Sequence, residues 1–494
     1  MDPNSHVINR ENNEEEEVQD DDVDLILSRP SEQPKRYFLE CALVLLFFGN
    51  NLISTLLTNQ MLKQACLQFN YNTSVCDNLN QNESDSTSKE IEKEVQPYIA
   101  NINMVTSIIH TVIPAILSLF LGPFSDTYGR KPILNSTFMG YALTLIAFAS
   151  VCFYSEYIQP ISPWIYALCY IPETLFGGWP SLLTATLCYV TDTTEETKRP
   201  FRLLIIELII FIGVLLGNLL CSIILSATNA FMVFAISATC GFFATIFIIF
   251  LVDESVNAPQ QAHLYEKLTH LLSPVYIIDM IKTCFKRRPF KERKILLSLI
   301  TILMLSVFAF SGNSTIGYLF ERLKFSWTLK DHNYYSSYNI IITIFGSVLG
   351  FGILKKIFKL SDMTLTCIAL LSGLADSGLK AFATYPWHFY LISSLTLFRI
   401  LSSPMCRSLI SNIIPQNEIG KIFSITTSFE ALSDLVAAPL YTYVYNSTYQ
   451  TFPGAFFLIT AGVCVINVGL AFYTIAMKRI RETLINPYTM IEDN

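Results

Sequence analysis

Apolar runs of about 20 residues recur along the chain, and they constrain its fold more than any other feature. Each run is long enough to cross the ~30 Å hydrocarbon core of a bilayer as a helix. Only 15% of the residues are charged, whereas a soluble chain carries roughly 25%. The chain therefore lacks the polar surface of a soluble protein, and we expect an all-α integral membrane protein with many spans.

Hydropathy predicts about twelve transmembrane helices in two six-helix halves. They lie near residues 37–59, 102–121, 132–153, 163–190, 201–226, 230–252, 295–319, 336–358, 363–383, 387–410, 420–444 and 453–477. This layout predicts an acidic tail over 1–33, an N-terminal half over 34–252, a basic linker over 253–294, a C-terminal half over 295–478 and a second tail over 479–494. Tandem halves of this kind occur in many secondary carriers.

Cations gather in the predicted turns on one side of the membrane, for example Arg130 and Lys131 after the second span. Since such clusters mark the cytoplasmic side, we expect both termini to be cytoplasmic. Glycosylation sequons at Asn72, Asn82 and Asn446 fall on the opposite, lumenal side and are predicted glycan sites.

Cys66 and Cys76 share the long polar loop that follows the first span, so they are a candidate disulfide. The other cysteines lie mostly in apolar segments, where a thiol behaves as a small buried hydrophobe. The net charge of −7 comes mainly from the tail and the loop over 77–94. Nothing resembles a nucleic-acid surface, a metal cluster or a nucleophile–base pair, so we expect no nucleic-acid partner, no cofactor, no metal and no enzyme.

The segment "GPFSDTYGRKP" (residues 122–132) places an acid and two cations between two apolar runs. It resembles the signature of the major facilitator superfamily, matching it at Gly122, Asp126, Gly129, Arg130 and Lys131. The resemblance implies a gate in which Asp126 pairs with a cation or a helix N-terminus in one conformation and loses that partner in the other. A plainer interpretation makes Arg130 and Lys131 simple topology charges.

Three further segments narrow the resemblance. "FGGW" (residues 176–179), "TDTTEETKRPFRLLIIELIIFIGVLLGN" (residues 191–218) and "SSPMCRSLISNIIP" (residues 402–415) resemble solute carrier family 46, the proton-coupled folate transporter family. This implies proton-coupled transport of a bulky organic anion. The folate carrier's histidine in span seven is absent from residues 302–320, so folate-like, muropeptide-like and similar substrates all stay open.

Charged residues inside the spans are functional candidates, because their insertion costs roughly 2.5–3.5 kcal/mol. By resemblance, Glu207 matches the family's proton-coupling glutamate, and Arg407 matches its arginine, which is tied to coupling and substrate affinity. A guanidinium at this position can clamp a carboxylate. Arg399 is expected to share that cavity. Glu430 and Asp434, four residues apart on one helical face, form either a second proton site or a partner for Arg407.

Other intramembrane charges have plainer interpretations. Asp376 and Lys380, also four apart, are expected to neutralise each other. Glu173 lies close to, but not on, the family's acidic position, and His110 is expected to be a packed neutral imidazole.

Two short patterns suggest sorting adaptors as partners. Asp21, Leu25 and Ile26 fit an acidic dileucine motif, and Tyr488–Ile491 fits a tyrosine motif. These patterns make an endolysosomal membrane a second possible destination, in addition to the plasma membrane.

The leading hypothesis is a proton-coupled symporter of an organic anion. The alternatives are a transport-silent receptor or scaffold of the same fold, and a facilitative carrier that uses no protons. Retained charges within the spans argue against both.

Overall fold

The computed structural model describes residues 38–78, 86–255, 274–327, 329–448 and 450–492, and the regular elements in these ranges are all helical. The chain divides into two units, residues 1–34 and 35–494, and all described residues belong to the second.

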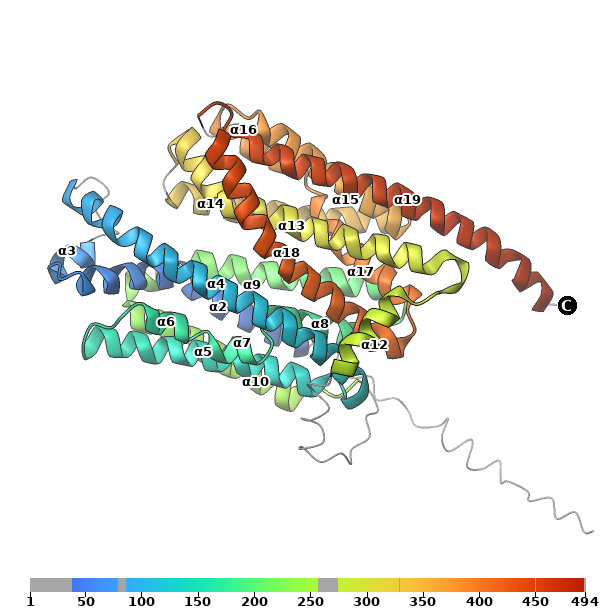
Figure 1. Cartoon of the computed structure of the whole chain (residues 1–494), viewed down its shortest axis with the longest axis horizontal. Helices are drawn as coiled ribbons and strands as arrows, with labels where there is room; N and C mark the ends of the chain where they lie inside the picture. The colour runs from blue at the N-terminus through green and yellow to red at the C-terminus, as the bar shows by residue number, and fades with distance from the viewer. Residues whose placement is uncertain (1–37, 79–85, 256–273, 328, 449, 493–494) are drawn as a thin grey trace, which may run out of the picture. The chain divides into compact units, whose positions relative to one another are not determined.

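The described helices form an N-terminal set and a C-terminal set, joined by a linker helix (Figure 1). The N-terminal set is α2 (Phe38–Gln68), α3 (Thr73–Asn78), α4 (Ser86–Tyr128), α5 (Lys131–Tyr157), α6 (Trp164–Leu168), α7 (Ile171–Leu175), α8 (Gly178–Asp192), α9 (Arg199–Ala227) and α10 (Ala230–Leu251). The linker holds α12 (Pro274–Phe285) and η1 (Pro289–Lys291). The C-terminal set is α13 (Glu292–Phe325), α14 (Leu329–Leu349), η2 (Gly350–Ile357), α15 (Asp362–Ala381), α16 (Pro386–Leu395), η3 (Arg399–Leu401), α17 (Ser402–Ile413), η4 (Gln416–Glu418), α18 (Ile419–Thr448) and α19 (Ala455–Glu492).

Each predicted span coincides with helix. Among the described residues, 8 helices are long and apolar enough to cross a membrane by length and composition, or up to 9 if one bent pair counts as a single span. The predicted spans at 163–190, 363–383 and 420–444 do not meet that test. The first is broken into short helices, and the other two carry acid residues and many hydroxyls that lower their mean hydropathy.

Two predicted spans are discontinuous rather than straight, which corrects the expectation of single helices over 163–190 and 387–410. The first is interrupted between α7 and α8, where Gly177 and Gly178 have φ of +90° and +48°. Glycine adopts this left-handed conformation readily because it has no Cβ. The second bends by 52° between α16 and the η3–α17 segment.

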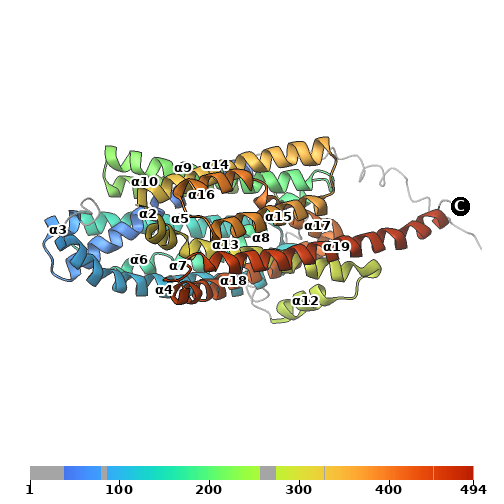
Figure 2. The same ribbon diagram turned by 90° about the horizontal axis from the view of Figure 1, so that it is seen from above.

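Figures 1 and 2 place α3 at one end of the bundle and α12 at the other. We call the end that carries Arg130, Lys131, Arg199 and α12 the basic end, and the end that carries α3 the loop end. The sequence predicts that the basic end is cytoplasmic.

The apolar cores show where the two sets meet. The cluster nearest the basic end mixes residues of both sets, such as Leu182 and Leu187 with Leu409 and Phe423. Toward the loop end, one cluster contains only N-terminal residues and another only C-terminal residues. The two sets therefore share a core at the basic end and pack separately at the loop end.

Candidate functional site

The Asp126 carboxylate, near the end of α4, binds the N-terminus of α18. The backbone N–H groups of Gly420 and Lys421 donate to its two oxygens at 3.1 and 3.2 Å. The first N–H groups of a helix have no partner within the helix and carry positive partial charge, so a carboxylate satisfies and stabilises them. This contact joins the two sets of helices at the basic end.

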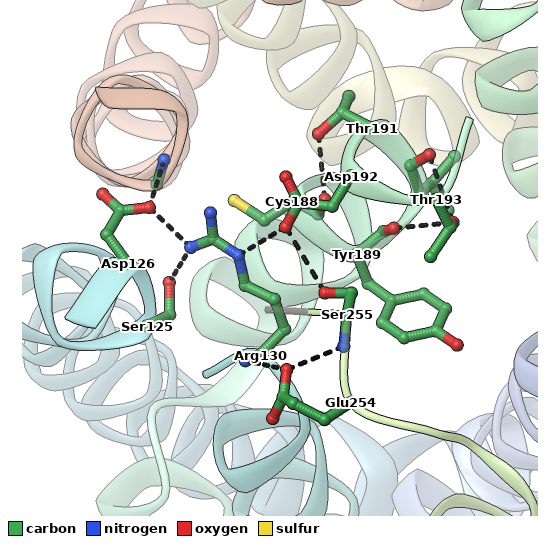
Figure 3. Close-up of polar contacts among 12 residues, drawn as sticks. Ser125, Asp126, Arg130, Cys188, Tyr189, Thr191, Asp192, Thr193, Glu254 and Ser255 are labelled. Atoms are coloured by element: carbon green, nitrogen blue, oxygen red, sulfur yellow. Dashed lines mark hydrogen bonds and ion pairs between the residues drawn. The ribbon is translucent and has the colours of Figure 1, made fainter. Parts of the chain in front are cut away.

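Arg130 holds that carboxylate in place (Figure 3). Its Nη1 lies 2.6 Å from Asp126 Oδ1, and its Nε lies 2.8 Å from Oδ2 of Asp192 at the end of α8. The Arg130 side chain is only 2% exposed. A guanidinium shared by two carboxylates fixes the relative positions of α4 and α8.

Glu254, just after α10, completes the cluster by accepting the backbone N–H groups of Arg130 and Lys131 at 2.8 and 3.1 Å. Figure 3 shows its carboxylate below Arg130. Glu254 thus binds the N-terminus of α5 as Asp126 binds that of α18. We call Asp126, Arg130, Asp192, Glu254 and the α18 N-terminus the basic-end network.

Two glycines of the signature segment allow these close approaches. Gly129 has φ of +102°, and a Cβ there would overlap the Glu254 carboxylate. A Cβ on Gly122 would overlap the Ser424 side chain and the Gly420 carbonyl on α18. Gly122 thus allows α4 and α18 to approach each other closely here.

Further polar contacts join the two sets close to the network. Thr184 Oγ1 on α8 lies 2.7 Å from Thr427 Oγ1 on α18, and Ser428 Oγ donates to the Ala115 carbonyl at 3.0 Å. Arg199 Nη1 donates to the Ser411 carbonyl at 2.8 Å, at the end of α17. Together they close the basic end.

A chain of charged and hydroxyl groups lies deeper, and it also connects the two sets. On α9, Glu207 accepts a hydrogen bond of 2.6 Å from Ser403 Oγ on α17, whose oxygen in turn accepts one of 3.2 Å from Arg407 Nε. Arg407 Nη2 donates to both carboxylate oxygens of Glu430 on α18, at 3.1 and 2.9 Å. We call Glu207, Ser403, Arg407 and Glu430 the central chain.

The central chain leaves one strong donor unused. Arg407 and Glu430 are each 5% exposed, yet Arg407 Nη1 is buried and has no hydrogen-bond partner among the described residues. A buried guanidinium N–H without an acceptor is costly, so an anionic group that reached it would bind favourably.

Comparisons with known proteins fit this architecture. The family model described as Major Facilitator Superfamily matches residues 39–438. The "Probable peptidoglycan muropeptide transporter SLC46" of Drosophila melanogaster is 33% identical over 449 residues, covering 88% of this chain and 86% of that protein. The chain belongs to the major facilitator superfamily, in solute carrier family 46. It is therefore a multi-pass membrane transporter and not an enzyme.

More distant proteins agree with this assignment. The "Lysosomal proton-coupled steroid conjugate and bile acid symporter SLC46A3" of Gallus gallus is 25% identical, covering 88% of this transporter and 93% of that protein. The crystal structure of the human organic anion transporter MFSD10 (TETRAN) matches this structure with a TM-score of 0.65 at 15% sequence identity. The match covers 90% of this chain and 100% of that chain. That structure shows the shared fold.

The transporter places Arg399 in a different network from Arg407. Because the tenth span is bent, Arg399 turns toward α14 and α15, where Nη1 lies 3.6 Å from Asp376 Oδ1 and Nη2 donates to Thr343 at 3.2 Å. Lys380 lies 2.8 Å from the other oxygen of Asp376, so the Asp376–Lys380 ion pair is present as predicted. No described contact joins Arg399 to the central chain.

Asp434 lies one turn beyond Glu430 on α18 and is partly buried. Ser311 on α13 contacts its carboxylate, and Oδ1 is buried without a hydrogen-bond partner among the described residues. Of the two predicted roles for the Glu430–Asp434 pair, the structure places Glu430 as the partner of Arg407.

The predicted lumenal features lie at the loop end. The structure joins Cys66 and Cys76 by a disulfide, and Asn72 and Asn446 are exposed. Asn82 lies outside the described residues, as do Asp21, Leu25 and Ile26, whereas Tyr488–Ile491 falls within α19.

Several residues of these sites were not predicted from the sequence. Asp192 and Ser403 lie within segments that carry the family resemblance but were given no role, and Glu254 lies outside those segments. Arg199 is one of the cations that follow the fourth predicted span, and its contact with α17 was not predicted.

Proposed function

We propose that this transporter is a proton-coupled symporter of a bulky organic anion, in which Glu207 takes up the proton and Arg407 binds the anion. The central chain carries the proposal, because it places an acid, a hydroxyl and a guanidinium in continuous contact across the two sets of helices.

Charge balance explains why a proton is required. One guanidinium faces two carboxylates, so the chain with Glu207 ionised carries one negative charge that has no counter-charge within it. A net charge enclosed by protein and lipid is unfavourable. Proton binding to Glu207 removes that charge and lets the two sets close around the chain.

The anion would enter by competing with Glu430. Arg407 already uses Nη2 for Glu430, while Nη1 lacks a partner. A carboxylate on the substrate can take a two-pronged contact with the guanidinium. Displacement of Glu430 then alters the contacts between α17 and α18 and biases the equilibrium between the open states.

The structure represents the state with a closed basic end. Release on that side requires the basic-end network to open, and each hydrogen bond to a charged group contributes about 1.5–3 kcal/mol. We infer that residues 34–252 and 295–478 move against each other and that Gly122, Asp126, Gly129, Arg130 and Lys131 act on this gate rather than on substrate affinity.

Uptake into proteoliposomes tests the proposal. Radiolabelled folate, a bile-acid conjugate and a muramyl peptide should each be supplied at about pH 5.5 and about pH 7.4. At least one should accumulate faster with an inward proton gradient, and Arg407→Ala should raise the concentration for half-maximal uptake. Uptake without any proton dependence would instead favour a facilitative carrier, and binding without uptake would favour a receptor.

We also propose delivery to endolysosomal membranes through the two tail motifs. The lysosomal relative supports this destination. One variant replaces Leu25 and Ile26 by alanine, a second carries Tyr488→Ala, and a triple variant combines them. Each should move a tagged transporter toward the plasma membrane. An unchanged distribution in the triple variant would remove the motifs from the account.

A further inference from the structure

A histidine and a glutamate form a close pair in the N-terminal set, away from the central chain. His110 Nε2 on α4 lies 2.9 Å from Glu173 Oε1 on α7. The Glu173 side chain is 4% exposed and the His110 side chain 30%. The carboxylate is thus enclosed by protein, and the imidazole is the more exposed member of the pair.

The pair lies at the break in the fourth span. Glu173 is in the last turn before Gly177 and Gly178, and a Cβ on Gly178 would touch Pro114, one turn along α4 from His110. The Thr144 hydroxyl of α5 accepts the Glu173 backbone N–H at 3.0 Å. Interrupted helices in corresponding positions of two halves often mark the binding region of a carrier, and the bent tenth span is the matching interruption here.

Among the described residues, neither member of the pair forms an ion pair with a third charged side chain. α5 contributes the Tyr141 hydroxyl, which hydrogen-bonds Glu173, and Tyr170 packs edge-on against the imidazole at 5.1 Å. The other described elements that contact α4 or α7 carry their ionisable groups mostly near the two ends of the bundle. At the basic end these are Cys188, Tyr189 and Asp192 on α8, Glu40 on α2, and Asp279, Lys282 and Glu418 on α12 and η4. Lys63 of α2 lies near the loop end, and α6 carries Tyr166.

α18 is the remaining neighbour of α4, and it carries two carboxylates. Glu430 is held by Arg407. Asp434 lies six residues beyond Ser428, which contacts Ala115, and His110 lies five residues before Ala115. At a rise of about 1.5 Å per residue, Asp434 and His110 therefore lie at about the same distance from the Ser428–Ala115 contact, measured along their two facing helices.

The corresponding break in the C-terminal set has a different chemistry. There Asp376 is held by both Lys380 and Arg399, which keep their charge at physiological pH. The imidazole is the cation-forming side chain whose ordinary pKa, about 6.5, falls within the physiological range. The acid at the break in the tenth span, Asp376, therefore has a counter-charge that does not change with pH. The acid at the break in the fourth span, Glu173, has a counter-charge that depends on pH.

We propose that His110 and Glu173 form a second proton-binding site, separate from Glu207, that is loaded from the loop end. The inference rests on the proposed function, since it assumes proton-coupled transport. One proton from solution, held between Nε2 and Oε1, makes the pair neutral overall. Without it the enclosed Glu173 carboxylate has no counter-charge, which favours the state in which the loop end admits water. Proton binding thus permits the loop end to close.

The test measures closure of the loop end with the proton as the only ligand. Spin labels on unnatural amino acids at Thr73 and Asn446, both exposed, report the open and closed populations of the full-length transporter in lipid nanodiscs between about pH 7.5 and 5.5. A proton that binds only the closed state changes the population ratio by up to about tenfold per pH unit. His110→Gln and Glu173→Gln, which keep hydrogen-bonding capacity, should each make the change less steep by up to about tenfold per pH unit, and the share that Glu207 contributes should remain.

The matched control is a second histidine–glutamate pair at the loop end. His332 Nδ1 lies 2.6 Å from Glu321 Oε2, with side chains 29% and 5% exposed, so His332→Gln removes the same chemistry at similar exposure. The His332→Gln substitution should leave the pH response of loop-end closure unchanged. The double variant His110→Gln with Glu173→Gln should respond to pH no less than each single variant does, because the two residues hold one proton together.

Other outcomes separate this inference from the proposed function. If Glu207→Gln removes the response while His110→Gln and Glu173→Gln retain it, proton coupling stands and the second site is wrong. If Asp434→Asn alone removes it, the second site lies on α18 and the assignment to His110 is wrong. If the wild type does not respond at all, both the second site and proton-driven closure are overturned.

Discussion

Asp126 touches both sets of helices with one carboxylate, receiving Arg130 from its own set and the Gly420 and Lys421 N–H groups from α18. The side chain is 6% exposed, so these contacts are shielded from water and exceed the ~0–1 kcal/mol of a surface ion pair. We therefore expect this residue to bias the equilibrium between states rather than to contact the substrate.

Asp126→Asn should weaken the closed basic end by about 1–3 kcal/mol and slow net uptake, leaving equilibrium substrate affinity nearly unchanged. Arg130→Ala should act in the same direction, because Asp126 and Asp192 both lose their cation. Lys198→Ala is the control, since Lys198 and Glu195 form an ion pair that is 64% and 68% exposed. Parallel uptake and binding assays check this prediction. A loss of binding with normal turnover would place Asp126 in the substrate site instead.

At the level of elements, the closest approach of α4 and α18 depends on Gly122. Gly122→Ala places a Cβ against Ser424 and the Gly420 carbonyl, so α18 must shift and the basic end should open. Labelling of a cysteine introduced at Asn412 should then be faster than in the parent. Gly317→Ala is the control, because a Cβ there meets nothing within 4 Å. Equal labelling in both variants would show that the helices have room to spare.

The segment that directly follows the linker helix α12 forms ion pairs with η4, beside the basic-end network. Lys286 and Arg288 contact Glu418 at 2.9 and 2.6 Å. Although burial alone would raise the pKa of the Glu418 carboxyl, hydrogen bonds from these two cations hold it below its ordinary value. A carboxyl with a lowered pKa stabilises the contact at pH above about 4.3, and the effect is lost only as the pH falls through the lower folded value.

Glu418 should therefore stay ionised between about pH 5 and 7.5, and it should not contribute to acid stimulation. Glu418→Gln should free the linker and alter the rate of uptake while leaving the midpoint of its pH dependence unchanged. Uptake measured across that range checks the prediction. A midpoint displaced as far as in Glu207→Gln would contradict it.

The sequence was sufficient to predict the helices because 20-residue apolar runs have few alternatives. The signature segment likewise predicted that Asp126 pairs with a cation or a helix N-terminus, and the structure shows both contacts. The breaks at Gly177–Gly178 and before Arg399 were missed, because glycine and threonine are also common in continuous transmembrane helices. Arg399 was consequently expected to share the cavity of Arg407, whereas it contacts Asp376 and Thr343 instead.

At the scale of the whole molecule, orientation decides which end receives the substrate. Asn72, Asn82 and Asn446 should carry glycans, because the charge pattern places them on the lumenal side, whereas Asn135 inside α5 should not. The triple Asn→Gln variant should lose the glycosidase-sensitive mobility shift of the wild type. A shift that persists would overturn the assignment of the basic end to the cytoplasm.

In the proposed mechanism the proton and the substrate bind to different sets of helices, because Glu207 and Arg407 lie in different sets and meet through Ser403. Glu207→Gln keeps the hydrogen bond to Ser403 but holds a permanently neutral side chain. It should therefore allow exchange of substrate across the membrane, flatten the pH dependence and abolish uphill accumulation. Arg407→Lys should restore only part of the affinity lost in Arg407→Ala, because an ammonium lacks the two-pronged geometry. Counterflow and net uptake in the same proteoliposomes separate the two steps. If Glu207→Gln still accumulates substrate uphill with an unchanged acid optimum, the coupling proton binds elsewhere, and Asp434 with its unpartnered Oδ1 is the next residue to replace.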